Sequence, residues 1–233
     1  MPPTTKKTPP KTAGVDYEII AYQRGLRTII GIDEAGYGAW AGPVVAGAVC
    51  LPPVDDDLQE ALTGVRDSKL MTARQRERLS DIIRETALTW GVGHASHEMV
   101  DSIGIRGAAR VAMQNALNDA LARRPDLQPD CLFLDGLGVT APIHTSEHLP
   151  IKYGDRLSLT IASASVLAKV WRDDHMRELH EHWPDYGFAQ HKGYGTPAHR
   201  AALNKLGVCA IHRRSYRPIR ECLEATTSGR ADT

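Results

Sequence analysis

Two apolar stretches of the sequence each run into acidic residues that stand beside a glycine. Residues 31–36 read Gly-Ile-Asp-Glu-Ala-Gly and residues 132–136 read Leu-Phe-Leu-Asp-Gly, which places Asp33, Glu34 and Asp135 at the ends of the two stretches. Carboxylates brought close together repel one another, and this repulsion favours either protonation or a bound cation. Because oxygen ligands suit hard cations, a converging set would bind Mg²⁺ or Mn²⁺.

The elements that must position these acids are β-strands. Apolar, β-branched residues run from Thr28 to Ile32 and from Cys131 to Leu134, and each run predicts a short buried strand. Ligand sites in open α/β sheets lie at the carboxyl ends of strands. Side chains alternate between the two faces of a strand, so Asp33 and Glu34 reach one site only if the strand ends there. The alternative is a plain turn with solvated acids.

The rest of the chain predicts a layered α/β protein. A third strand is expected over Val44 to Leu51, and helices are expected over Thr72–Thr89, Ala108–Leu121 and Ser163–His182 from their apolar periodicity. Residues 186–218 are rich in Gly, His and Arg and predict loops with one short helix. We therefore expect a central mixed sheet flanked by helices.

Composition limits the class of protein. The 233 residues predict one main domain over 15–224, between disordered tails at 1–14 and 225–233. No apolar run approaches a membrane span or a signal peptide, so we expect a cytoplasmic protein without a membrane partner. The 28 basic and 28 acidic residues balance, which argues only weakly against nucleic acid, because the location of charge matters more than its sum.

One pattern imitates a dinucleotide site. Residues 36–41, Gly-Tyr-Gly-Ala-Trp-Ala, fit the G-x-G-x-x-A fingerprint after a strand. That fingerprint must open a helix, whereas Gly42-Pro43-Val44-Val45 indicates a turn into a strand. An acid pair placed before the glycines would also repel a pyrophosphate, so we reject this interpretation.

A resemblance to a known family rests on six blocks in a fixed order. They are Gly-Ile-Asp-Glu-Ala-Gly (31–36) followed by Ala-Gly-Pro-Val-Val-Ala (41–46); Asp-Ser-Lys (67–69); Leu-Asp-Gly (134–136); Lys-Tyr-Gly-Asp (152–155) running into Ile-Ala-Ser-Ala-Ser-Val-Leu-Ala-Lys-Val (161–170) and Arg-Asp (172–173); Tyr-Gly-Phe (186–188) with His-Lys-Gly-Tyr-Gly-Thr (191–196); and His-Arg-Arg-Ser-Tyr (212–216). In this order they resemble the ribonuclease HII family, over roughly residues 27–218.

The resemblance implies a ribonuclease H-like fold with a C-terminal helical segment at about 180–224. It implies hydrolysis of the RNA strand of RNA–DNA hybrids and incision 5′ of ribonucleotides embedded in duplex DNA, leaving 3′-hydroxyl and 5′-phosphate ends. The family's four metal-binding and catalytic carboxylates fall on Asp33, Glu34, Asp135 and Asp155. Two Mg²⁺ or Mn²⁺ ions are implied, with Asp33 bridging both.

Further residues are implied to contact substrate. Lys69 would stabilise charge near the scissile phosphate, and Ser68 would cap a helix or contact phosphate. Tyr194 would stack on the sugar and sense its 2′-hydroxyl. Residues Gly36, Tyr37 and Gly38 stand where the family usually has Gly-Arg-Gly, so backbone contacts are kept and a guanidinium is lost.

Several interpretations remain open beside this one. A basic cluster at Arg213, Arg214, Arg217 and Arg220 indicates either a solvated face or a phosphate-contact patch. A ribonuclease HIII-like enzyme with altered junction preference is an alternative, although residues 1–26 are too few for the extra N-terminal domain of that family. A non-catalytic hybrid-binding protein is another alternative, and it would not need the four acids. We expect a monomer.

Overall fold

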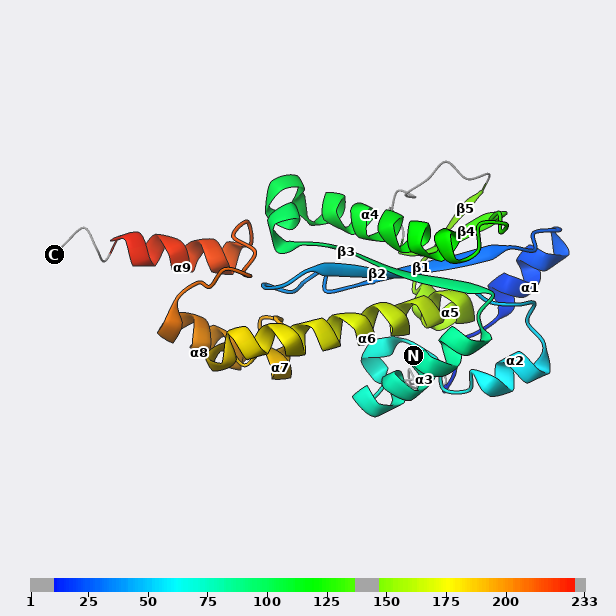
Figure 1. The fold of residues 1–233 in the computed structure, drawn as a ribbon, viewed down its shortest axis with the longest axis horizontal. Helices are drawn as coiled ribbons and strands as arrows, with labels where there is room; N and C mark the ends of the chain where they lie inside the picture. Colours follow the sequence, from blue (N-terminus) through cyan, green and yellow to red (C-terminus); the bar gives the residue numbers. More distant parts are fainter. Residues whose placement is uncertain (1–10, 137–146, 229–233) are drawn as a thin grey trace, which may run out of the picture.

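The computed structural model describes residues 11–136 and 147–228 of the chain. Its centre is a five-stranded sheet in the order β3-β2-β1-β4-β5 (Figure 1). The strands are β1 (Ile29–Ala35), β2 (Val44–Cys50), β3 (Thr89–Ala95), β4 (Cys131–Asp135) and β5 (His148–Ile151). Antiparallel pairing joins β1 to β2 and β2 to β3, whereas β4 pairs parallel to both β1 and β5. The expected mixed sheet is confirmed.

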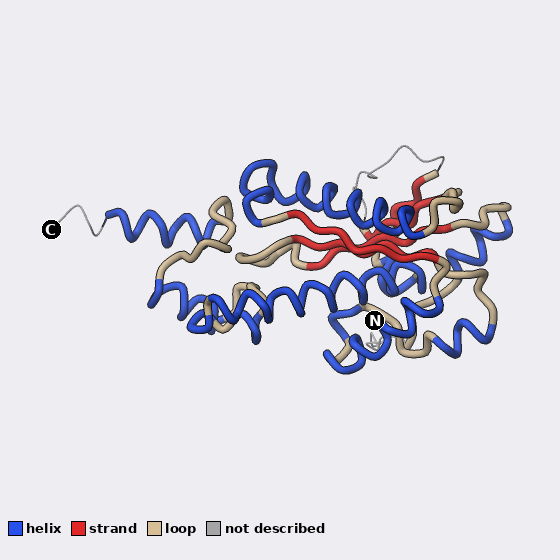
Figure 2. Tube along the Cα trace, viewed as in Figure 1, coloured by secondary structure: helices blue, strands red, loops and turns tan. Residues whose placement is uncertain are grey.

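Helices lie on both faces of this sheet. The long helix α4 (His97–Arg123) covers one face and α6 (Leu159–His182) covers the other (Figures 1 and 2). The remaining helices are α1 (Asp16–Gln23), α2 (Asp56–Ala61), η1 (Ser68–Leu70), α3 (Ala73–Thr86), α5 (Gly154–Leu157), η2 (Pro184–Tyr186), α7 (Phe188–His191), α8 (Pro197–Leu206) and α9 (Arg217–Ser228). In Figure 1, α9 extends beyond the end of the sheet.

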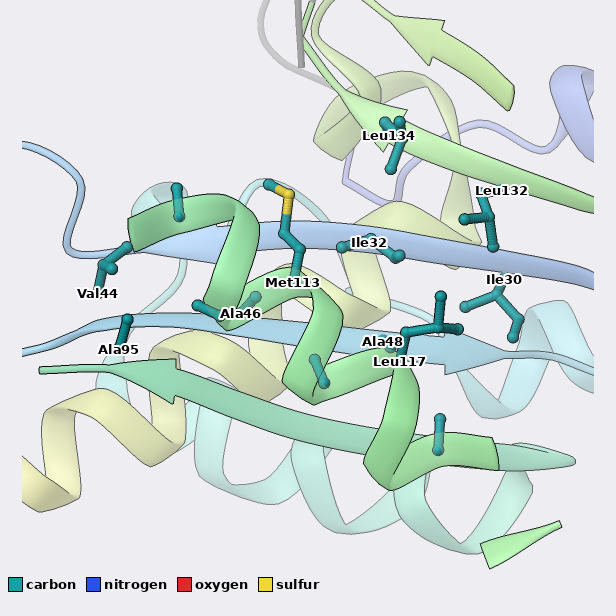
Figure 3. Close-up of a cluster of buried hydrophobic side chains, with 14 of the residues drawn as sticks. Ile30, Ile32, Val44, Ala46, Ala48, Ala95, Met113, Leu117, Leu132 and Leu134 are labelled. Carbon is teal, nitrogen blue, oxygen red and sulfur yellow. The ribbon is translucent and has the colours of Figure 1, made fainter. Parts of the chain in front are cut away.

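The α4 face of the sheet holds the largest apolar cluster (Figure 3). Ile30 and Ile32 of β1 point into it, and Met113 and Leu117 of α4 pack against them. Each such side chain, once buried, stabilises the fold by about 1.5–3 kcal/mol. The alternation of β1 therefore fixes which of its residues face α4, and the intervening residues must face α6.

Strand β3 was not expected from the sequence, because the residues on its α4 side, among them Gly91 and Gly93, are small. A Cβ added to Gly93 would lie 2.2 Å from the Ala116 nitrogen, and one added to Gly91 would lie 2.2 Å from the Ala116 oxygen. The glycines thus allow the backbone of α4 to approach the strand closely. This approach, and not a β-branched composition, sets the sequence of β3. Strand β5 was also not expected.

Helix boundaries follow capping residues more closely than apolar periodicity. Helix α3 begins after Thr72, whose side chain forms a capping box with Gln75, as expected. Helix α6 begins at Leu159, four residues earlier than expected, because Ser158 Oγ accepts the Ile161 amide. Helix α4 begins at His97, well before the expected residue 108, and non-helical backbone at Gly104 (φ 74°) kinks it.

The ends of the chain differ from expectation where the structure describes them. Residues 12–14, expected to be disordered, pack onto the domain: Thr12 Oγ1 accepts the Gly64 amide, and the Ala13 amide donates to the Val65 carbonyl. Helix α9 runs to residue 228, into the expected C-terminal tail. The expected tails at 1–10 and 229–233 lie outside the described residues.

The C-terminal region is more helical than the expected loops with one short helix, since η2, α7, α8 and α9 follow one another there. All four cysteines are free, and Cys50 and Cys131 are buried. Within 11–136 and 147–228, no helix combines the length and apolar character needed to cross a membrane.

Candidate active site

The candidate site lies where β4 ends beside β1. Ile32 pairs with Leu134 in the parallel register, so one residue further along Asp33 stands level with Asp135. Strand β4 ends there, whereas β1 continues to Ala35. Glu34 therefore extends past the end of its neighbouring strand, into space that β4 does not fill.

The expectation that β1 stops at Asp33 is wrong. A Cβ added to Gly31 would lie 2.6 Å from the backbone of Thr160 in α6, so Gly31 faces α6. Asp33 is two residues further along the strand and therefore faces α6 as well. Glu34 follows Ile32 and leaves from the α4 face. The two acids share one region because the neighbouring strand ends, and not because their own strand does.

Asp135 is tied to the start of α5. Its Oδ1 accepts the Gly154 amide at 2.7 Å. Asp155 follows Gly154 in the chain, so this bond brings Asp155 close to Asp135. A Cβ on Gly154 would lie 2.6 Å from Ile161 Cδ1 and 3.2 Å from Asp135 Oδ1, so a larger residue would have to displace the Ile161 side chain. The preceding residue, Tyr153, adopts a left-handed conformation (φ 61°) that turns the chain into α5.

Burial and mutual repulsion dominate the electrostatics of the site. Burial, followed by the charges of Glu34 and Asp135, holds the pKa of Asp33 well above its usual range. Burial and then Asp135 raise the pKa of Glu34 to about 7. The pKa of Asp155 rises to about 6 for the same two reasons in the same order. At neutral pH these acids resist carrying their full charge together.

The donor set fits a hard divalent cation, because all of its side-chain donors are carboxylate oxygens. Among the described residues, no three His, Cys, Asp or Glu side chains lie close enough together to form a ready-made metal site. Asp33 and Glu34 leave from opposite faces, and one oxygen of Asp135 already accepts an amide. A cation would have to draw these carboxylates inward, and it would relieve their repulsion as it did so.

Lys69 is the cation that faces this cluster. Its Nζ lies 3.9 Å from Asp155 Oδ2, and its side chain is 74% exposed. Burial lowers the pKa of Lys69, but the attraction of Asp33 and Asp155 outweighs that effect, so the net shift is upward. The η1 turn that carries it is capped by Asp67, whose Oδ1 accepts the Lys69 amide and whose Oδ2 accepts from Arg156.

Ser68 does not cap this turn, contrary to one of the two roles expected for it. Its side chain is buried, and its Oγ lies 3.0 Å from Ser165 Oγ on α6. Ser165 in turn donates a hydrogen bond that opposes the rise in the pKa of Asp33. Sequence reasoning missed Ser165 and Arg156. The signal for Ser165 was a hydroxyl within an otherwise apolar helix.

Tyr194, in the turn between α7 and α8, contacts two cationic side chains of α6. The Lys169 Nζ and the Arg172 guanidinium carbon are 5.5 Å and 5.2 Å from the centre of its ring. Four residues of α-helix rise about 6 Å, so Lys169, which contacts the ring, stands about that far along α6 from Ser165, the residue that bonds Asp33. Lys169 is itself held by Asp173, at the i,i+4 spacing of helix ion pairs.

The loop after β1 carries the Gly36-Tyr37-Gly38 segment. Gly36 has φ 87°, and an added Cβ would lie 2.0 Å from the buried Arg172 Nε, so only glycine fits. Tyr37 is 40% exposed, and its carbonyl accepts from Arg213 NH1 at 3.1 Å and from Tyr216 at 2.5 Å. A Cβ on Gly38 would meet no atom of the protein within 4 Å.

Arg213 corrects the expected phosphate-contact patch. Its side chain is fully buried, and it donates to the carbonyls of Tyr37 and Gly42. Arg172 is equally buried and donates to the carbonyls of Ala41, Pro43 and Lys192. The two buried guanidiniums therefore hold the backbone of the β1–β2 loop in place. Because its side chain is buried, Arg213 cannot contact a phosphate. Arg214, Arg217 and Arg220, in contrast, are exposed.

Comparison with known proteins gives a consistent set of relatives. The family model described as ribonuclease HII matches residues 30–219. A ribonuclease HII of Syntrophotalea carbinolica is 48% identical over 201 residues, which cover 86% of this chain and 90% of that protein. The crystal structure of ribonuclease H2 from Pyrococcus horikoshii OT3 has a TM-score of 0.68 at 23% identity, over 86% of this chain and 99% of that one. Bst ribonuclease HIII in complex with Mn²⁺ has a TM-score of 0.66 at 17% identity, over 89% and 73% of the two chains. These structural likenesses establish the fold.

Proposed function

This chain belongs to the ribonuclease HII family, and from that membership we propose that its clustered carboxylates hold the divalent cations of the reaction. The chain is an endoribonuclease that acts on RNA–DNA hybrids. The proposed ligands are Asp33, Glu34, Asp135 and Asp155. We further propose that it incises 5′ of ribonucleotides embedded in duplex DNA and leaves 3′-hydroxyl and 5′-phosphate ends.

One observation carries the assignment of the ligands. Burial and the neighbouring carboxylates raise the pKa values of Asp33, Glu34 and Asp155, and Lys69 lies beside this cluster. A cluster of this kind costs stability unless a cation or a proton compensates its charge. Function explains why the sequence keeps it. Mg²⁺ or Mn²⁺, when bound, would supply Lewis acidity to the attacking water and the departing oxygen.

Residues of this chain would orient the substrate around that centre. Lys69, largely exposed and charged, would contact the scissile phosphate and stabilise negative charge as it develops. The ring of Tyr194 would stack on the sugar of the ribonucleotide. The backbone around Gly38, with no protein atom close above it, would approach the substrate. Asp33, held by Ser165, would stay fixed as the central ligand.

The decisive experiment uses a DNA duplex with a single embedded ribonucleotide, incubated with the protein and Mg²⁺ or Mn²⁺, with the cut mapped at nucleotide resolution. We expect one incision 5′ of the ribonucleotide and no cutting in excess EDTA. Asp135→Asn should abolish the incision, whereas Asp126→Asn, at an exposed acid paired with Arg124, should leave it intact. Near-normal turnover of Asp135→Asn would overturn the ligand assignment.

The alternatives receive no support from a specific observation. A non-catalytic hybrid-binding protein would gain nothing from buried, mutually repelling acids, and its stability would suffer from them. All proposed ligands come from one chain, which supports action as a monomer on hybrid duplexes and on DNA that contains ribonucleotides. Equal binding without cleavage in the assay above would favour the non-catalytic alternative.

A further inference from the structure

Three buried histidines form a cluster outside the carboxylate site. His191 ends α7, His199 lies on α8, and His212 precedes α9. His199 and His212 are fully buried, and the rings of His191 and His199 stack with centroids 4.4 Å apart. Their hydrogen bonds run to backbone groups, to one another and to Cys209, so the cluster is built from neutral imidazoles and not from ion pairs.

The contacts of this cluster determine the tautomer of each ring. The carbonyl of Tyr194 can only accept, so His199 Nδ1, 3.1 Å away, carries the proton and its Nε2 is the acceptor. His199 Nε2 lies 3.0 Å from His212 Nε2, which must therefore donate. His212 Nδ1 is then an acceptor, and it faces a donor, the Cys209 amide, at 3.0 Å; the Cys209 carbonyl, which could only accept, lies further away at 3.3 Å. Reasoning from the Cys209 amide in the opposite direction gives the same assignment.

The third histidine, His191, binds the backbone just before Tyr194. His191 Nδ1 accepts the Gly193 amide at 3.2 Å, so its Nε2 donates to the Tyr186 carbonyl at 2.7 Å. One imidazole thus binds the amide of Gly193 and another binds the carbonyl of Tyr194. The backbone on both sides of the tyrosine is fixed by rings that cannot rotate without losing a hydrogen bond.

We propose that His199 and His212 form a directed hydrogen-bond relay that positions Tyr194 for the ribonucleotide. The relay runs from the Cys209 amide through both imidazoles to the Tyr194 carbonyl. It rests on the proposed function only in the role given to the tyrosine ring. His199 and His212 are positioning residues, since both are buried and neither would touch the substrate.

The segment that carries His212 also contacts the β1–β2 loop. His212 forms a β-bridge with Ala41, and the next residue, Arg213, donates its amide to the Trp40 carbonyl and its guanidinium to the Tyr37 carbonyl. Two adjacent residues therefore connect the Tyr37 loop with the Tyr194 turn. Residues 212 and 213 therefore help to fix the distance between the Tyr37 loop and the Tyr194 turn, the two elements proposed to contact the substrate.

A matched pair of substitutions separates positioning from packing. In His199→Asn the amide nitrogen replaces Nδ1 and can still donate to the Tyr194 carbonyl, but the link to His212 is lost. In His199→Gln the amide oxygen replaces Nε2 and can still accept from His212, but the donor to Tyr194 is lost. Cleavage of the single-ribonucleotide duplex is measured as kcat and KM for the full-length chain, with folding checked by thermal denaturation.

We expect His199→Gln to lower kcat/KM by about tenfold and His199→Asn to lower it by no more than about threefold. The loss in His199→Gln should vanish in a Tyr194→Ala background, because the relay then has no ring to position. Equal losses in the two variants, or losses that add to that of Tyr194→Ala, would overturn the proposal.

A second measurement needs no variant and no activity. Nitrogen-15 NMR of the histidine rings should find the proton on Nδ1 of His199 and on Nε2 of both His191 and His212. A proton on His199 Nε2 would overturn the relay even if the enzyme cleaves as proposed. Wild-type protein that shows these tautomers but cleaves no ribonucleotide-containing duplex would instead contradict the proposed function and leave the relay in place.

Discussion

At the residue scale, Asp33 and Asp173 are both buried aspartates, but they lie in surroundings of opposite charge. Burial and then Glu34 raise the pKa of Asp33, whereas Asp173 lies 2.5 Å from Lys169 Nζ and 3.1 Å from Arg76. We expect Asp33→Asn to raise the Tm of the metal-free protein by about 2–6 °C. Asp173→Asn should lower Tm by about 5–10 °C, because it leaves two cations uncompensated. Calorimetry in EDTA measures both.

The effect of Asp33→Asn also has a definite pH dependence. The folded-state pKa of Asp33 lies above its unfolded value, so above about pH 4 the folded wild type retains a proton that the unfolded chain has released. Wild-type stability therefore falls as the pH rises through that window, and the variant is spared this loss. The Tm advantage of Asn should grow from about pH 5 to about pH 8. An advantage that shrinks over this range would refute the electrostatic explanation.

Tyr37 occupies the position at which the resemblance leads us to expect arginine. Its carbonyl is held by Arg213 and Tyr216, and its side chain is partly exposed, so the side chain can change while the backbone stays in place. We expect Tyr37→Arg to tighten substrate binding and to steepen its salt dependence by about one phosphate contact. The measurement is Kd against salt concentration, with the ratio of junction to hybrid cleavage. If neither quantity changes, the side chain points away from the substrate.

At the element scale, two glycines of the β1–β2 loop, Gly36 and Gly38, have different surroundings. Gly36 has a positive φ and lies against Arg172, so Gly36→Ala should lower Tm by about 5 °C or more. Gly38 has neither constraint. Gly38→Ala should therefore leave Tm within about 2 °C of the wild type and still lower kcat/KM, because the missing Cβ leaves room for the substrate. Thermal denaturation and cleavage are measured on the same preparations. A Gly38→Ala protein with normal cleavage would remove this loop from the proposed substrate surface.

The same scale shows which elements the sequence could predict. Strands β1, β2 and β4 are apolar and α3 has a clear cap, so all four elements were predicted. Their ends were predicted less well, because β1 continues to Ala35 and α3 ends at Thr86. Strand β3 was missed because its glycines serve close contact with α4, a reason that periodicity cannot detect. The start of α6 was missed because Ser158, and not an apolar residue, determines it.

At the scale of the whole molecule, the convergence of the acids depends on pairing that no local pattern contains. The parallel register of β1 and β4 sets Asp33 level with Asp135. The pattern of a strand ending in an acid was enough to select those two residues. Asp155 and Lys69 come from separate turns that meet the strands only after folding, so only the resemblance to a family pointed to them.

The N-terminal segment links the edge of the fold to the candidate site, and it sets the limit for truncation. Thr12 and Ala13 bond to residues 64 and 65, and the Gly14 amide donates to the carbonyl of Arg156, the residue after Asp155. From the sequence alone, residues 1–14 are predicted to be dispensable for chemistry; the structure limits that prediction to residues 1–10. Deletion of 1–10 should leave Tm and turnover unchanged under saturating substrate.

Deletion of 1–14 should lower Tm by about 3–8 °C, since it removes three hydrogen bonds and a buried alanine. It should also reduce turnover, because Arg156 pairs with Asp67, which caps the turn that carries Lys69. Substrate affinity separates this structural effect from a loss of basic residues. The three lysines of the tail contribute only salt-sensitive binding, so high salt should abolish any difference in KM and leave the difference in kcat. Equal kcat for the two truncations would show that the segment stabilises the fold without positioning the site.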